Sequence, residues 1–229
     1  MPLPTIALPV LLAALLAGAE QPGGDKPVDA KPADTAAPAK SAFPASVKKN
    51  LYANNDLRGK AAPKFEVEKW LAPKSAGNTG EVKPADTKDK VVLIDFWATW
   101  CPPCRAAIPE LNKWQKTFKD DLVIIGVSDE DARKVQPFLD KTPIDYAMAI
   151  DTKARMKNAV GVQGIPNVLV IGTDNIVRWQ GFPASQEEHL SEATLRQIIE
   201  ADKARRASEK KSEPASPPAK TPTEPAPKK

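Results

Sequence analysis

Histidine and cysteine are scarce in this chain, whose 229 residues include one histidine, His189, and two cysteines, Cys101 and Cys104. A zinc site of the usual kind needs four ligands, so two sulfurs and one distant histidine fall short of it. No cysteine lies near the end of the apolar N-terminal stretch, which excludes lipid attachment of the bacterial lipoprotein kind. The Cys-x-x-Cys-His pattern of a covalent haem site is also absent. We therefore expect the protein to need no metal and no cofactor.

Positive charge is missing from the middle of the chain, where nucleic-acid binding would need it, and from the residues before the N-terminal apolar run. The net charge of +4 comes from the two ends of the chain, and the near-neutral middle argues against nucleic-acid binding. No Lys or Arg precedes the apolar run of residues 3–17, yet the small residues at 17–19 suit cleavage after Ala19. This run is short for a membrane span, which takes about 20 residues. Residues 1–19 thus predict a signal peptide or an uncleaved N-terminal anchor, which would be the only membrane contact, and export to the periplasm or cell envelope.

Proline marks the domain boundaries. Of the 24 prolines, eight lie before residue 51, six after residue 203 and ten in between. Segments rich in Pro, Ala and Lys bury too little apolar surface to fold. We therefore expect a disordered linker over residues 20–50, one folded domain over 51–203 and a disordered basic tail over 204–229.

Within the domain, hydrophobic patterns alternate between those of strands and those of helices. Strands are expected at residues 64–71, 91–98, 122–128, 146–150, 168–171 and 176–179. Helices are expected at residues 102–118, 131–140, 152–160 and 186–204, with a loop over 72–89 and a hairpin turn at 172–175. This order predicts an α/β domain in which helices flank a mixed central sheet.

Cys101-Pro102-Pro103-Cys104 carries the clearest chemistry in the sequence. It lies where a buried strand gives way to a helix, so the Cys101 sulfur is expected near free backbone N–H groups and the positive end of the helix dipole, which stabilise a thiolate. Cys104 would lie one turn further and could resolve a mixed disulfide. A purely structural disulfide is the alternative, but a loop this short gains only about 2 kcal/mol in the chain-entropy model. A redox dithiol is therefore favoured over a structural disulfide or a metal site.

Asp95 stands inside the apolar run of residues 91–98. An ionised carboxylate is costly to desolvate, so we expect the pKa of this group to be raised. Six residues before Cys101, it could accept the Cys104 proton as that thiol attacks a mixed disulfide. The alternative is a structural Asp bonded to backbone or water.

These residues together resemble a thioredoxin-fold oxidoreductase. The match rests on Trp-Cys-Pro-Pro-Cys, on Asp95 before it, on Pro109 after it, and on Ile165-Pro166 late in the chain. The runs FWATWCPPCRAAIPEL and APKF resemble, more narrowly, the TlpA/ResA-like branch of exported thiol-disulfide oxidoreductases. The resemblance covers about residues 60–200 and implies a thioredoxin-like fold. Some relatives have Glu where this chain has Pro102, so a catalytic acid is not expected there.

The resemblance also implies the residues that would bind a substrate protein. It implies a cis peptide at Ile165-Pro166 that lies against the disulfide and exposes the Ile165 backbone, and Gly181 in the nearby groove. Trp100, beside Cys101, is expected to shield the active site.

We thus expect a monomer that exchanges disulfides with protein substrates and receives electrons from an upstream thiol donor. Pro102 and Pro103 lack an N–H, so the Cys101 thiolate should be only weakly stabilised, which favours the reductase direction. A thiol peroxidase is one alternative, although Ala98 and Ile94 stand where that family needs Thr and Pro. A non-catalytic binding module of the cell envelope is the other.

Overall fold

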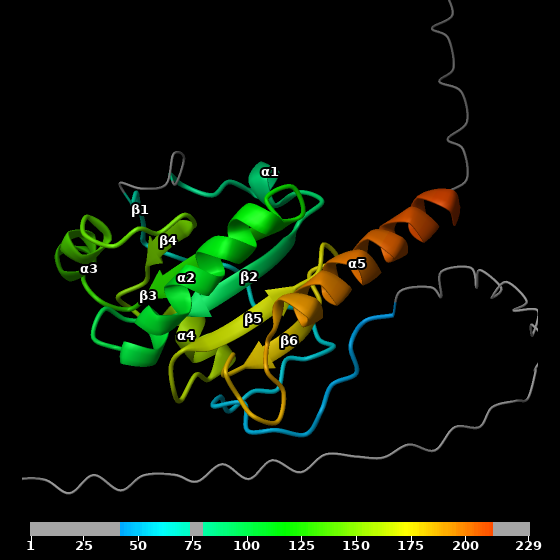
Figure 1. The fold of residues 1–229 in the computed structure, drawn as a ribbon, viewed down its shortest axis with the longest axis horizontal. Coiled ribbons are helices and arrows are strands. Elements are labelled where there is room, and N and C mark those ends of the chain that lie inside the picture. Colours follow the sequence, from blue (N-terminus) through cyan, green and yellow to red (C-terminus); the bar gives the residue numbers. More distant parts are fainter. Residues whose placement is uncertain (1–41, 74–79, 213–229) are drawn as a thin grey trace, which may run out of the picture. The chain divides into compact units, whose positions relative to one another are not determined.

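Six strands form one mixed sheet in the computed structural model, which describes residues 42–73 and 80–212 (Figure 1). In chain order the strands are β1 (Lys69–Leu71), β2 (Val91–Phe96), β3 (Leu122–Ser128), β4 (Ala147–Ile150), β5 (Asn167–Ile171) and β6 (Val177–Gly181). They lie in the order β1-β4-β3-β2-β5-β6. The β2-β3 and β3-β4 pairs are parallel, and the other three are antiparallel. The predicted mixed central sheet is confirmed.

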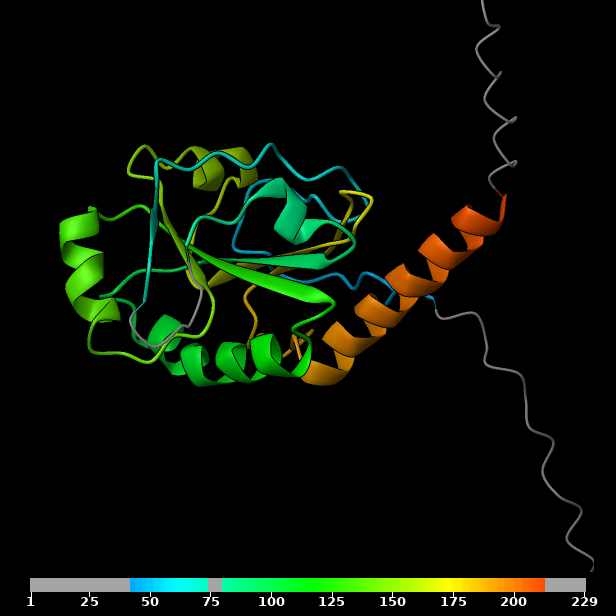
Figure 2. The same cartoon turned by 90° about the horizontal axis from the view of Figure 1, so that it is seen from above.

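Helices cover both faces of this sheet (Figure 2). They are α1 (Pro84–Thr87), α2 (Pro102–Thr117), α3 (Ala132–Leu139), α4 (Arg155–Val160) and α5 (Glu192–Ser212). In Figure 2, α2 and α5 lie on one face and α4 on the other. In the part of the chain that the structure describes, no helix is both long and apolar enough to cross a membrane.

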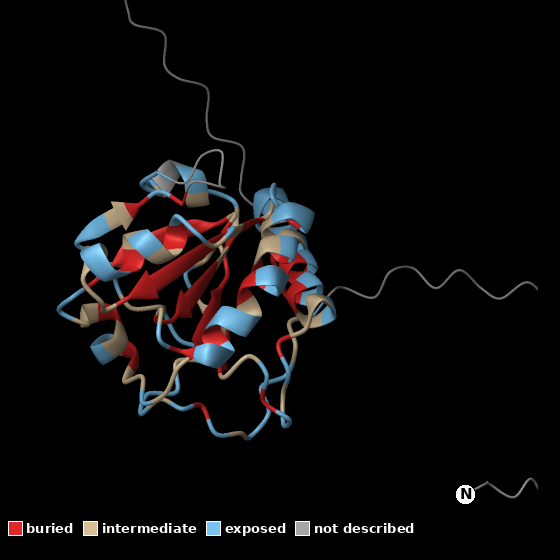
Figure 3. Cartoon of the chain, turned by 60° about the vertical axis from the view of Figure 1, so that its left-hand side comes forward, coloured by how far each residue is buried: buried red, intermediate tan, exposed pale blue. Residues whose placement is uncertain are grey.

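Strand β2 shows how the alternation of side chains divides the core in two. Leu93 and Trp97 belong to the cluster under α2 and α5, whereas Ile94 and Phe96 belong to the cluster that includes α4. The strands are buried and the outer sides of the helices are exposed (Figure 3). Because side chains two apart in a strand share a face, Asp95 points to the same side as Leu93 and Trp97. The sheet therefore presents its one buried acid on β2 to the α2 side.

Most predicted elements agree with the structure to within a few residues, but the first strand and the last helix do not. The first strand is expected over 64–71 and forms only at Lys69–Leu71. Phe65 and Val67 pack instead against the α4-side cluster, so their apolar alternation reflects burial without strand pairing. The loop expected over 72–89 contains the short helix α1.

Helix α5 begins and ends later than predicted, at Glu192 and Ser212 rather than at 186 and 204. His189, expected on this helix, is exposed in the preceding loop. The first proline after the domain is Pro214, so nothing in the sequence interrupts the helix before it. The prediction of a disordered tail is therefore wrong for residues 204–212, and residues 213–229 lie outside the described part.

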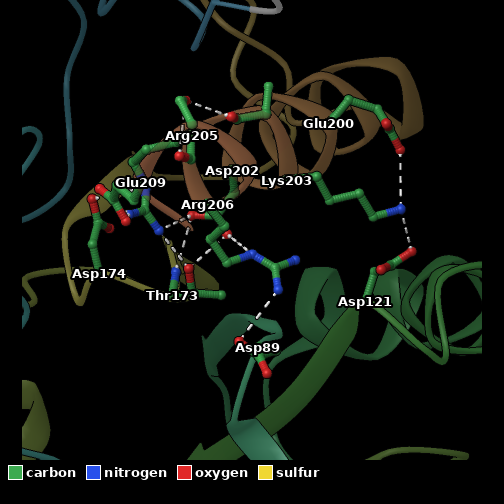
Figure 4. A network of polar contacts seen from close by, with 12 residues as sticks. Asp89, Asp121, Thr173, Asp174, Glu200, Asp202, Lys203, Arg205, Arg206 and Glu209 are labelled. Carbon is green, nitrogen blue, oxygen red and sulfur yellow. Dashed lines mark hydrogen bonds and ion pairs between the residues drawn. The ribbon is translucent and has the colours of Figure 1, made fainter. Parts of the chain in front are cut away.

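A polar network holds the end of α5 (Figure 4). The carboxylate of Asp202, only 1% exposed, accepts hydrogen bonds from the backbone N–H and hydroxyl of Thr173 at 3.1 and 2.7 Å. Arg205 and Arg206 pair with the same carboxylate at 3.2 Å, and Arg206 also reaches Asp89. Basic residues that composition assigns to a solvated tail thus compensate a buried charge.

The linker prediction is wrong at its C-terminal end. Residues 42–50 pack on the domain, where Phe43 contacts the main core and lies under the Arg178 guanidinium. The buried Lys49 ammonium pairs with Glu188 at 2.6 Å and lies 3.6 Å from the Trp179 ring centroid. The remainder of the predicted linker and residues 1–19 lie outside the described residues.

Candidate redox site

Cys101 and Cys104 form a disulfide at the N-terminus of α2, with an S–S distance of 2.05 Å. Cys101 is the N-cap residue in an extended conformation, and Pro102 and Pro103 occupy the first turn, where a missing N–H costs no intrahelical bond. The backbone N–H of Cys104 lies 3.3 Å from the Cys101 sulfur and points to it. The helix therefore directs one N–H donor and its positive dipole end at Cys101, as the sequence predicts.

Exposure does not distinguish the two cysteines in the disulfide state. Cys101 is 2% exposed and Cys104 is 1% exposed. The Cys101 sulfur is covered because the loop before β5 lies against it, with the Ile165 carbonyl oxygen 3.8 Å away. Trp100, by contrast, is 66% exposed, so it borders the site without burying its own ring. The helix positions of the two cysteines differ, whereas their accessibility in the disulfide state does not.

Asp95 is buried in the sheet on the side that faces α2. It is 2% exposed and lies between Gly126 of β3 and Val168 of β5. Burial raises the pKa of its carboxyl to about 7, as the sequence predicts in direction. The buried Tyr146 hydroxyl has its pKa raised by its own burial and then by the charge of Asp95. Asp95 can therefore change protonation near neutral pH on the face of the sheet that packs against the core cluster containing Cys104.

Gly126 pairs with Asp95 and has no side chain, so Met148 and Trp97 occupy the space next to it. A Cβ at this position would lie 2.5 Å from the Met148 sulfur and 3.1 Å from the Trp97 ring nitrogen. Only glycine fits here without moving Met148. The register Asp95–Gly126 thus allows large apolar groups to close over the carboxyl and desolvate it.

The loop before β5 has the geometry that the resemblance implies. The Ile165-Pro166 peptide bond is cis. Ile165 is half-buried and its carbonyl faces the Cys101 sulfur. Gly181 is buried, pairs with Val168 and faces Lys49, whose Nζ would lie 3.3 Å from an added Cβ. Lys49 thus covers the expected groove position at Gly181, and substrate contact there stays a prediction.

Glu130 is a residue that the sequence analysis missed. Its carboxylate accepts the backbone N–H of Thr99 at 2.6 Å and the Thr99 hydroxyl at 2.9 Å. Its own backbone N–H donates to Ser128 at 3.2 Å. Glu130 thereby fixes the turn that carries Trp100 and Cys101. The sequence does contain an indication of this contact, because Thr99 and Glu130 each come shortly after a buried strand. The carboxyl ends of the adjacent parallel strands β2 and β3 meet at one edge of the sheet.

Three further residues near the motif lie in the core or on the surface. Trp97 is 1% exposed and packs against Phe138, so it belongs to the core. Arg105 and Glu110 are exposed on α2. Within residues 42–73 and 80–212, no three His, Cys, Asp or Glu side chains are grouped so that they could hold a metal ion.

A thioredoxin-like sheet with a Cys-x-x-Cys disulfide at a helix N-terminus, beside a cis-proline loop, defines a thiol-disulfide oxidoreductase. The model of the AhpC/TSA family matches residues 58–180, more than half of the chain, and the protein belongs to this family.

Named relatives agree with this class. The chain is 31% identical over 144 residues to the thioredoxin-like protein YneN of Bacillus subtilis, a match that covers 61% of this chain and 75% of YneN. It is 33% identical over 128 residues to the thiol:disulfide interchange protein DsbE of Escherichia coli, covering 54% of this chain and 64% of DsbE. The thiol-disulfide oxidoreductase ResA of Bacillus thuringiensis is 30% identical over 142 residues, with 61% and 78% covered.

Solved structures show the same fold. A crystal structure of a candidate DsbE from Chlorobium tepidum has a TM-score of 0.50 and 31% identity, and covers 63% of this chain and 97% of its own. A thioredoxin-like protein in its oxidised form has a TM-score of 0.52 at 23% identity, covering 64% and 99%. The protein is thus a thiol-disulfide oxidoreductase related to ResA and DsbE.

Proposed function

We propose that this protein reduces disulfides in other proteins outside the cytoplasm. The observation that carries the proposal is the Cys101–Cys104 pair at the N-terminus of α2, on the side of the sheet where Asp95 is buried with a pKa of about 7. The named relatives are described as interchange proteins and oxidoreductases, which supports protein disulfides as the substrate class. The apolar run of residues 3–17 supports export.

The proposed reaction uses Cys101, Cys104 and Asp95 in turn. The Cys101 thiolate attacks one sulfur of a substrate disulfide, forms a mixed disulfide and expels the other substrate sulfur as a thiolate. Asp95 then accepts the proton of Cys104, whose sulfur attacks Cys101 and releases the second substrate sulfur as a thiolate. The substrate gains two electrons and this protein ends as the disulfide. A thiol donor must return two electrons before the next cycle, and the proton held by Asp95 returns to Cys104 as the disulfide opens.

The reductase direction rests on how little the helix offers to the Cys101 thiolate. Pro102 and Pro103 have no N–H, so the Cys104 N–H at 3.3 Å is the donor that the first turn supplies. Strong oxidants of this fold depend on a well-stabilised thiolate. A weakly stabilised thiolate makes the dithiol a better electron donor, so we expect a reduction potential nearer that of thioredoxin, about −270 mV, than that of the strongest oxidants, about −120 mV.

Reduction of insulin with dithiothreitol as donor tests the activity, and equilibration with glutathione or dithiothreitol tests the direction. Cys101→Ser should abolish the acceleration, with Arg105→Ala as an exposed control on the same helix. An inactive wild-type protein would refute the catalytic proposal and leave a binding module. A potential near −120 mV would make the protein an oxidant.

The family match makes a thiol peroxidase the second candidate. Ala98 and Ile94 occupy the positions where that chemistry needs Thr and Pro, and both are buried in the core. We therefore expect no peroxide consumption above that of a free thiol. A rate that depends on Cys101 and exceeds that level would favour the peroxidase.

A further inference from the structure

Residues 49–55 form a strap across the loop that precedes β5. The Asn54 N–H donates to the Gly161 carbonyl at 2.8 Å, and the Asn167 side-chain amide donates to the Leu51 carbonyl at 2.8 Å. Ala53 forms an isolated bridge with Val162. This strap therefore lies beside Ile165, the residue whose carbonyl faces the Cys101 sulfur.

Tyr52 turns sharply within this strap. Its φ is +49°, a left-handed conformation that is strained for a side chain of this size. The turn directs its carbonyl to the N–H groups of Gln163 at 2.8 Å and Gly164 at 3.3 Å. It also leaves the side chain on the surface, with the residue 44% exposed. Backbone strain of this kind persists where the surroundings hold it and is concentrated at functional sites.

The Tyr52 ring is fixed from two sides. Its centroid lies 5.7 Å from that of Phe182, at an interplanar angle of 57°. Its Cδ1 atom would lie 3.4 Å from a Cβ placed on Gly164. A glycine at this position allows the ring to lie directly against the backbone that leads to Ile165. The contacts thus run from Tyr52 through Gly164 and Ile165 to Cys101.

Two exposed aromatic rings border the two segments that meet at the disulfide. Among the described residues, the large exposed hydrophobic side chains are Val47, Tyr52 and Trp100, and the last immediately precedes Cys101. Exposed, rigidly held aromatic residues are enriched at binding interfaces. One ring borders the disulfide on its own turn, and the other borders the Ile165 loop.

We propose that Tyr52 is a specificity-determining residue, which contacts the substrate polypeptide beside its reacting cysteine and favours an aromatic side chain there. The reacting cysteine of the substrate must reach the Cys101 sulfur. In an extended substrate segment, each neighbouring residue lies about 3.3 Å further along the chain. The Tyr52 ring lies against Gly164, the residue before Ile165. It could therefore contact the substrate side chain next to the reacting cysteine. Ring–ring contacts of this kind correspond to roughly a three- to tenfold difference in rate. The inference rests on the proposed function only in taking the partner to be a cysteine-containing polypeptide.

A single exchange step tests this without catalytic turnover. In the Cys104→Ser variant, Cys101 is first converted to its mixed disulfide with thionitrobenzoate. A peptide thiolate then attacks the Cys101 sulfur, the Cys101–peptide disulfide forms, and coloured thionitrobenzoate leaves as the thiolate. The measured quantity is the ratio of rates for two peptides that differ only in Phe or Gly beside the cysteine.

We expect the Phe peptide to react about three to ten times faster than the Gly peptide when residue 52 is Tyr or, in Tyr52→Phe, Phe. In Tyr52→Asn the two peptides should react at nearly the same rate. Asparagine tolerates a left-handed backbone and removes the ring, so this variant keeps the turn. Val47→Ala, on the neighbouring part of the chain, should leave the ratio unchanged. A ratio near one with Tyr52 present would overturn the inference. An unchanged ratio in Tyr52→Asn would also overturn it, even if both peptides reacted more slowly by the same factor. Because the assay needs one exchange only, an inactive enzyme in the insulin assay would count against the proposed function and leave this outcome intact.

Discussion

The carbonyl oxygen of Ile165 lies 3.8 Å from the sulfur of Cys101, although 64 positions separate the two residues in the chain. This contact brings the loop before β5 against the disulfide and buries a sulfur that a helix N-terminus alone would leave open. We therefore expect a substrate to approach Cys101 along this loop. The proposed redox and recognition residues would then meet at this pair of atoms.

Asp95→Asn should stabilise the oxidised protein at neutral and alkaline pH. The folded-state pKa of about 7 lies above the ordinary value of 3.8, so the folded protein holds a proton that the unfolded chain releases between these pH values. The free energy of unfolding of the wild type should therefore fall as pH rises from 4 to 7. The variant should gain about 4 kcal/mol relative to it at pH 8 and almost nothing at pH 4.

Urea unfolding at the two pH values measures this difference. Asp120→Asn, at an exposed position, is the control and should show no such gain. If Asp95→Asn is destabilised at pH 8, the carboxylate has a stabilising partner and Asp95 is structural.

Asp95→Asn should also slow the resolution of mixed disulfides by about 10–100-fold at pH 8, because it removes the group that accepts the Cys104 proton. Below pH 6 the wild-type carboxyl is mostly protonated, so the two proteins should converge. Stopped-flow measurement of Trp fluorescence during oxidation by a peptide disulfide follows this step. Parallel pH profiles for both proteins would rule out Asp95 as the proton acceptor.

Cys104→Ser should accumulate mixed disulfides with substrate proteins, whereas Cys101→Ser should not. Cys101 is the N-cap residue whose sulfur accepts the Cys104 N–H and contacts the loop before β5, so we expect it to be the attacking group. Non-reducing electrophoresis of cells that express each variant shows the adducts. Adducts formed by Cys101→Ser alone would reverse the two roles.

Glu130→Ala should loosen the turn before Cys101. It removes two acceptors from Thr99, and hydrogen bonds to a charged group contribute about 1.5–3 kcal/mol each when buried, less at this half-buried position. The amide of Thr99 should lose most of its protection against hydrogen exchange, and the free energy of unfolding should fall by about 1–2 kcal/mol. Glu110→Ala, exposed on α2, should change neither quantity, and unchanged protection in Glu130→Ala would show that the turn holds itself.

The sequence by itself determined the chemistry of this protein. The strand–Cys-Pro-Pro-Cys–helix order and the buried acid at Asp95 follow from local hydrophobic pattern and helix-end chemistry, which involve residues close together in the chain. The mixed sheet follows from the alternation of strand and helix patterns along the chain. Each of these features needs only short-range information, and the structure agrees with it.

The tertiary structure alone decided the borders and surroundings of the site. Composition placed residues 42–50 and 204–212 in disordered tails, yet Lys49 pairs with Glu188, and Arg205 and Arg206 pair with the buried Asp202. Lys49 looks solvated in the sequence because its partner Glu188 lies far along the chain. Asp202 is close to both arginines in sequence, but it is buried against Thr173, 29 positions away, and only the fold shows this. The same holds for the position of Tyr52 beside Ile165, because its backbone conformation and its neighbours come from the fold. Short-range pattern gave the reactive groups, and long-range contacts decided what covers and borders them.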